Sequence, residues 1–150
     1  MIALRSRKGV AAIEFALVLP LLIVFVFGII EFGLLMYNQQ IITNASREGA
    51  RAGIVAASPR FPGNGVSCAS LPAGSIECVV TNYAKTHMIT FGAPNDPVTT
   101  VTPAYNASAP FSQNLQVVVT YNYGFLVFAN FVSIGGPTKT LSATTVMRYE

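Results

Sequence analysis

The chain has 150 residues, of which 52% are hydrophobic and only 10% are charged. This balance excludes a disordered polyelectrolyte, and the length allows one small domain at most beside a membrane segment. The formal net charge of +3 comes wholly from the N-terminal leader, because residues 10–150 hold equal numbers of basic and acidic side chains. With no basic patch outside the leader, we expect no nucleic-acid partner.

The first two elements are a basic leader, residues 1–9, and an apolar run from Val10 to Ile30. The leader is not expected to be helical. The apolar run would span about 30 Å as a helix, which is the thickness of the hydrocarbon core of a bilayer. Because Lys and Arg beside such a run tend to stay in the cytoplasm, we expect the N-terminus inside and the C-terminal part outside. The membrane-spanning part is predicted over residues 10–36, with Glu31 at the outer interface.

Glu14 is the only charged residue of the apolar run. A carboxylate at such a position costs roughly 2.5 kcal/mol or more unless it is paired or lies near the interface. If the chain is cut after Gly9, the new α-amino group of Val10 and the Glu14 carboxylate share one end of the helix, where a low dielectric strengthens their attraction. The carboxylate could pair with the amine of its own chain or with that of a neighbour, and the second pairing would fix the axial stagger of two chains. The alternative is a carboxylate at the level of the lipid headgroups.

One long helix is predicted over residues 10–57, so that it continues well beyond the membrane. Pro20 removes one backbone donor and should kink or loosen the helix near residues 16–20. In the second half, small residues recur at every fourth position: Ala45, Gly49, Gly53 and Ala57. Such a ridge lets another backbone approach closely, and that backbone belongs either to the chain's own domain or to another subunit.

Residues 58–150 are predicted to form an extracytoplasmic globular domain with one short helix. Ser75 is a candidate N-cap for a helix at 76–88, whose apolar stripe leaves out Glu77, Thr81 and Lys85. His87, the one histidine of the chain, is expected to be a partly buried residue at the edge of that helix.

The rest of this domain alternates between apolar and polar residues, which is typical of strands with one buried face. Strands are predicted at 98–102, 115–123 and 141–149, while the apolar segment 125–132 is either a strand or a buried loop. The fold class is therefore α+β. A long N-terminal helix, membrane-spanning in its first half, precedes a small antiparallel sheet on which the short helix packs.

Cys68 and Cys78 both lie on the exported side, where an oxidising compartment favours a disulfide between them; the alternative is a pair of buried free thiols. Two cysteines and one histidine cannot build a four-ligand zinc site without carboxylates, so no metal site is expected. The chain also shows no nucleophile elbow and no phosphate-binding loop. We expect neither an enzyme nor a cofactor.

Two blocks of sequence carry a resemblance to known proteins: residues 7–20, RKGVAAIEFALVLP, and residues 43–53, TNASREGARAG. They resemble the type IV pilin-like class, and more closely the TadE-like pseudopilins of Tad (Flp) pilus systems. The resemblance implies removal of the leader between Gly9 and Val10 by a prepilin peptidase, which leaves Glu14 as the fifth residue. Major Flp pilins are short and usually carry Tyr after this glutamate, whereas this chain has Phe15 and a sizeable domain, which favours a minor component of the pilus.

The resemblance also implies partners and a location. They are the prepilin peptidase, other Tad pilins and pseudopilins, the pilus assembly platform and the lipid bilayer of the bacterial inner membrane. Two other interpretations stay open at this point. One is a pseudopilin-like part of a type II-like secretion apparatus, and the other is a signal-anchored binding module that never assembles and keeps its leader.

Overall fold

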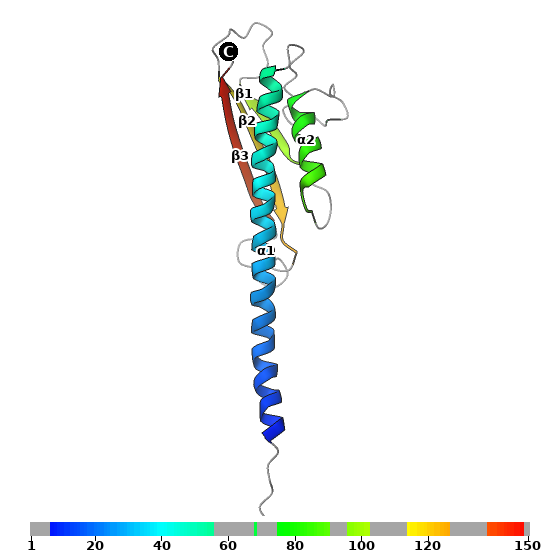
Figure 1. Ribbon diagram of the computed structural model, residues 1–150, viewed down its shortest axis with the longest axis vertical. Helices are drawn as coiled ribbons and strands as arrows, with labels where there is room; N and C mark the ends of the chain where they lie inside the picture. The colour runs from blue at the N-terminus through cyan, green and yellow to red at the C-terminus, as the bar shows by residue number, and fades with distance from the viewer. Residues whose placement is uncertain are drawn as a thin grey trace, which may run out of the picture.

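The computed structural model describes residues 7–55, 68, 75–90, 96–102, 114–126 and 138–148. These described residues form five elements along the chain: α1 (Arg7–Val55), α2 (Ile76–His87), β1 (Val98–Thr102), β2 (Asn114–Gly124) and β3 (Thr138–Arg148). The predicted α+β fold is confirmed. Figure 1 shows α1 as one long rod whose upper half lies against the sheet and α2, while its lower half stands clear of both.

The N-terminal end of α1 differs from the prediction. The helix begins at Arg7, so the last three residues of the predicted leader are helical. Arg and Lys are good helix formers, and the first amides of a helix, which have no partner within it, can bond to water, so the basic residues extend the helix at little cost. The predicted C-terminal end, Ala57, lies outside the described residues.

Pro20 does not interrupt α1. The helix is continuous across it, and Figure 1 shows no sharp bend in the lower half. The kink predicted near residues 16–20 is therefore not seen, and the alternative prediction, a loosened helix, is not tested. A proline removes one backbone hydrogen bond, and the other bonds of a 49-residue helix hold the segment in register.

The three strands form one antiparallel sheet in the order β1-β2-β3. Val117 in the central strand faces Val101 in β1 and Thr145 in β3. The alternation predicted for the central strand is confirmed, because the same five side chains are buried: Leu115, Val117, Val119, Tyr121 and Tyr123. In β3, Leu141 and Ala143 are buried as predicted, and Tyr149 lies outside the described residues.

The buried face of the sheet is covered mainly by α1. The second half of α1 contacts β2, β3 and α2, and its side chains Ile42, Ala45 and Ala50 belong to the same buried cluster as those of the sheet. The prediction that the short helix packs on the sheet is therefore only partly correct. α2 lies beside α1 (Figure 1) and reaches the sheet at one end, where Ile76 comes close to Leu115.

The ridge of small residues on α1 explains how α2 comes so near. A Cβ atom added at Gly53 would lie 2.6 Å from Ile76 Cδ1 and 2.7 Å from Leu115 Cδ2. At Gly49 an added Cβ would overlap a methyl group of Val80. Ala45 is also fully buried, so the described part of the ridge packs on the chain's own domain; Ala57 lies outside the described residues.

The second helix begins as predicted, because the Ser75 hydroxyl accepts a hydrogen bond from the Cys78 amide at 3.3 Å. Its buried side is broader than its apolar stripe. Glu77 and Thr81 are buried, contrary to the prediction, because each follows a buried residue, Ile76 or Val80, and the buried side of the helix extends about 100° past its apolar stripe. His87 is exposed and not partly buried; its ring stacks on Tyr83 with the ring centroids 4.4 Å apart.

The close contact at Gly49 gives a direct test of this packing. We expect Gly49→Ala to lower the free energy of unfolding by up to about 2 kcal/mol, because an overpacking cost of about 1–3 kcal/mol against the stiff Val80 exceeds the roughly 1 kcal/mol gain in helix propensity. Chemical unfolding of the detergent-solubilised chain measures the change. Gly33→Ala is the matched control, since an added Cβ there has nothing within 4 Å and the variant should be neutral or slightly stabilised. Equal stability of the two variants would contradict the packing described above.

Candidate functional site on the N-terminal helix

The uncovered half of α1 runs from Gly9 to Ile30, and nearly all of its side chains are exposed. Its 22 residues span about 33 Å as a helix. Among the described residues, α1 is the one helix long and apolar enough to cross a membrane, and its apolar window is not buried by any other part of the protein. An apolar surface of this size cannot face water without a large hydrophobic cost, so it requires a covering of lipid or protein.

The predicted processing junction lies in the first turn of this half. Gly9 and Val10 are both exposed, and an added Cβ at Gly9 would have nothing within 4 Å. The peptide bond between them is therefore remote from every contact of the folded domain. Glu14 is also exposed and lies four residues beyond Val10, so the two share one face of the helix. The structure thus places Val10 and Glu14 on one exposed face of the helix.

The uncovered half ends at a buried carboxylate, Glu31. Its side chain is only 4% exposed and accepts a hydrogen bond from the backbone amide of Leu126, just after β2. Burial raises the pKa of the Tyr123 hydroxyl, and the nearby Glu31 carboxylate raises it further. The sequence predicted Glu31 at the outer interface because it follows the apolar run directly, but no local pattern indicated its contact with Leu126, far along the chain.

Polar side chains of α1 hold the domain at a fixed height above this point. Asn38 is fully buried, and its amide group donates to the carbonyl of Ile89 at 2.9 Å and accepts from the amide of the same residue at 3.1 Å. Tyr37 donates to the His87 carbonyl at 3.0 Å, so two adjacent residues of α1 bind the end of α2. Gln39 donates to the Ser142 carbonyl of β3 at 2.9 Å.

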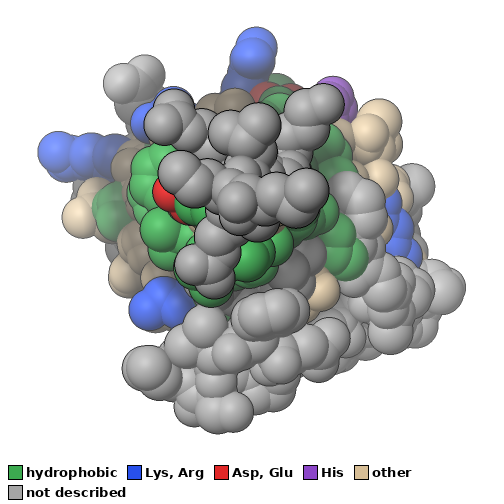
Figure 2. All heavy atoms as spheres, turned by 90° about the horizontal axis from the view of Figure 1, so that it is seen from below, with side chains coloured by type: hydrophobic (Ala, Val, Ile, Leu, Met, Phe, Trp, Pro, Cys, Tyr) green, Lys and Arg blue, Asp and Glu red, His purple; other side chains and the backbone are tan. Residues whose placement is uncertain are grey.

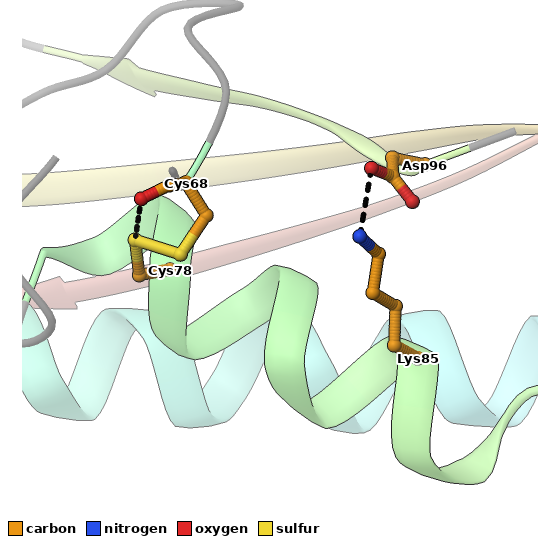
Figure 3. Close-up of polar contacts among 4 residues, drawn as sticks. All are labelled: Cys68, Cys78, Lys85 and Asp96. Atoms are coloured by element: carbon orange, nitrogen blue, oxygen red, sulfur yellow. Dashed lines mark hydrogen bonds and ion pairs between the residues drawn. A yellow bond between two sulfur atoms is a disulfide. The ribbon is translucent and has the colours of Figure 1, made fainter. Parts of the chain in front are cut away.

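The two cysteines lie at the other end of α2. Cys68 and Cys78 form a disulfide, which attaches the segment before α2 to the first turn of that helix (Figure 3). Figure 3 also shows Lys85 directed toward Asp96, at 3.0 Å, near the start of β1. Both side chains of this ion pair are exposed, so it contributes little to stability. In the part of the chain that the structure describes, no three His, Cys, Asp or Glu side chains are grouped closely enough to hold a metal ion.

Glu77 is the second buried carboxylate. One of its oxygens, Oε2, is buried without a hydrogen-bond partner. Burial raises the pKa of Glu77 from 4.5 to about 7, because the charged form loses its hydration. The glutamate was predicted to lie outside the buried stripe of the helix, and its own polarity gave no sign of burial.

Together these features define a class of protein: an α+β domain built around the second half of a helix whose first half is apolar and uncovered. Residues 9–51 match the family model of TadE-like proteins, which confirms the resemblance inferred from the sequence. The match covers less than a third of the 150 residues and lies wholly within α1. No match was found among curated proteins or among solved structures. At the family level, the match relates this segment to the pilin-like proteins of the Tad pilus, which are structural proteins.

The buried Glu77 predicts a pH dependence of stability. Its pKa is higher in the folded chain than in the unfolded chain, so the folded state binds the proton more tightly and its stability falls as the pH rises from 4.5 through about 7. A difference of one in pKa corresponds to about 1.4 kcal/mol, so the total loss in the free energy of unfolding is roughly 3 kcal/mol.

Thermal unfolding followed between pH 4.5 and 8 should show this loss. Glu77→Gln should remove it, whereas Glu48→Gln, at an exposed site on α1, should retain it. A pH dependence that survives Glu77→Gln would assign it to another group.

Proposed function

We propose that the protein is a minor pilin, or pseudopilin, of a Tad (Flp) pilus assembly system that helps to initiate or assemble the pilus. It is inserted in the bacterial inner membrane with its N-terminus in the cytoplasm and its domain outside. A prepilin peptidase removes residues 1–9. Other Tad pilins, pseudopilins and the assembly platform in the inner membrane are the partners that this role requires.

The observation that carries the proposal is the family match over residues 9–51, which begins at the residue where the leader would be cut. The structure supports it in two ways. The junction between Gly9 and Val10 is exposed at the start of the helix, where a protease can reach it. The uncovered half of α1 is a long apolar surface, which suits a bilayer before assembly and neighbouring helices after it.

Glu14 has a role that follows from its position. After cleavage, the amine of Val10 and the carboxylate of Glu14 would be a charge pair at one end of an apolar helix. Such a pair at about 4 Å is worth about 4 kcal/mol at an effective dielectric near 20. In a growing assembly, a Glu14 that reaches the amine of the adjacent chain would hold the two helices at one stagger. The contacts of the domain lie far along α1 from this end (Figure 1), so the pairing does not disturb them.

Processing can be measured first. The protein from native membranes should have Val10 as its N-terminal residue, and a strain lacking the prepilin peptidase should retain Met1; mass spectrometry of the intact chain and its N-terminal peptide distinguishes the two. Gly9→Leu should also abolish cleavage, and since Gly9 is exposed and an added Cβ there has nothing within 4 Å, the domain should fold as before. An intact Met1 in the wild type would instead favour a signal-anchored module.

The role of Glu14 is tested separately. Glu14→Gln should leave membrane insertion and cleavage intact but reduce co-purification with the pilus assembly by about tenfold or more, because a loss above about 1.4 kcal/mol corresponds to that factor. Co-purification with the other pilus components from native membranes is the measurement. Glu48→Gln, an exposed acid at the far end of the same helix, is the control and should assemble normally. Normal assembly of both variants would remove the proposed role of Glu14.

A further inference from the structure

We propose that the base of the domain is itself a membrane-binding surface, which enters the headgroup layer where α1 leaves the bilayer. Four exposed side chains form this surface, here called the basal collar: Phe32, Met36, Tyr37 and Leu126. The inference rests on the proposed function in one respect, since it requires that the uncovered half of α1 spans a bilayer.

The apolar surface of α1 does not end where the domain begins. On its covered side the uncovered half ends at Glu31, but on the neighbouring side Phe32 remains 63% exposed and Met36 follows it one turn later. The next residues along this ridge, Gln40 and Asn44, are polar. The exposed face of the helix therefore turns from apolar to polar after Tyr37, about 9 Å above Glu31. That distance matches the depth to which interfacial apolar groups are buried, about 5–10 Å.

Leu126 brings the sheet to the same level. Its backbone amide donates to the Glu31 carboxylate, so it lies beside α1 at the height of that residue, and its side chain is 48% exposed. An exposed leucine that follows the end of β2 thus sits in the same layer as Phe32. The collar is continuous along the helix axis with the apolar half below it.

The collar surrounds the helix, which favours lipid over a protein partner. With 3.6 residues per turn, Phe32, Met36 and Tyr37 point about 100°, 140° and 240° around the axis from Glu31. The backbone amide of Leu126 lies in the direction of Glu31 itself. A single protein partner would cover one side of such a ring, whereas the headgroup layer of a bilayer covers all sides at once.

The chemistry of the collar also suits the membrane interface. Tyr37 is half-exposed and keeps its hydroxyl bonded to a backbone carbonyl, as amphipathic rings at the headgroup level do. Lys139 is exposed and lies opposite Tyr123, near the same end of the sheet, where its charge would attract anionic lipids. Figure 2, seen from below along the helix, shows apolar side chains beside the axis of α1, with Lys and Arg side chains farther out.

Tryptophan scanning tests this arrangement, because the chain contains no tryptophan of its own. Four single variants of the full chain are reconstituted in vesicles of phosphatidylethanolamine and phosphatidylglycerol: Leu22→Trp, Phe32→Trp, Leu126→Trp and Asn44→Trp. Lipids brominated near the headgroup or deep in the acyl chain quench each fluorophore from the membrane, and aqueous iodide quenches it from the water. Phe32→Trp and Leu126→Trp should be quenched about twofold or more by the shallow bromines and be protected from iodide. Leu22→Trp should respond to the deep bromines and Asn44→Trp to iodide alone.

The other outcomes separate this proposal from membrane anchoring. If Leu22→Trp responds to the deep bromines but Phe32→Trp and Leu126→Trp are quenched by iodide as strongly as Asn44→Trp, the collar stands in water and the proposal is wrong, while the span remains. Protection of both collar sites from iodide and from every brominated lipid would show that protein covers them, which also overturns it. If Leu22→Trp does not respond to any brominated lipid, the helix does not span the bilayer, and both proposals fail.

Discussion

The packing of the second half of α1 against the sheet is the contact on which the structure depends. A sheet of three strands is not stable alone and needs a cover for its apolar face. In the described part of the chain that cover comes mainly from α1, through Ile42 and Ala45, while Gly49 and Gly53 let α2 approach on the adjacent side. Because a fully buried aliphatic side chain contributes about 1.5–3 kcal/mol, Ile42 and Leu115 make the helix inseparable from the domain it carries.

Polar contacts add what apolar packing cannot provide, a fixed axial register. Apolar ridges on a helix repeat every turn, so packing alone would permit a slip of about 5 Å along the axis. Asn38 prevents this, since both atoms of its buried amide group bind the backbone of Ile89, and a slip would leave four polar groups without partners. The hydroxyl of Ser46 meets that of Thr145 at 2.7 Å and fixes β3 in the same way.

This register determines how much of α1 remains free. The domain covers the helix from Glu31 upward and leaves about 33 Å of apolar surface below it, enough to cross a bilayer. The family match falls on α1 alone, so it spans both the uncovered half and the half that builds the domain. One helix therefore lies partly in an apolar environment outside the domain and partly in the core of the domain. The position of the domain along α1 determines the length of each part. A change in the buried contacts that moved the domain along α1 would therefore change the length of apolar helix available to span the membrane.

Much of the molecule could be predicted from local patterns. The five buried residues of β2 follow from alternation, the start of α2 from the Ser75 cap, and the family segment from its two sequence blocks. These features depend on residues close together in the chain, and periodicity shows directly which side chains are apolar.

The tertiary structure decided the remaining features, and each involves a partner far away in the sequence. Glu31 meets an amide 95 residues later, and Asn38 binds a residue 51 positions further on. The sequence period could not show whether the ridge of small residues faces the chain's own domain or another subunit. It also could not show which helix covers the sheet, because a periodic pattern identifies an apolar face but not the element that packs on it. Buried polar groups are the hardest case: their side chains look like surface residues until long-range packing removes the water around them.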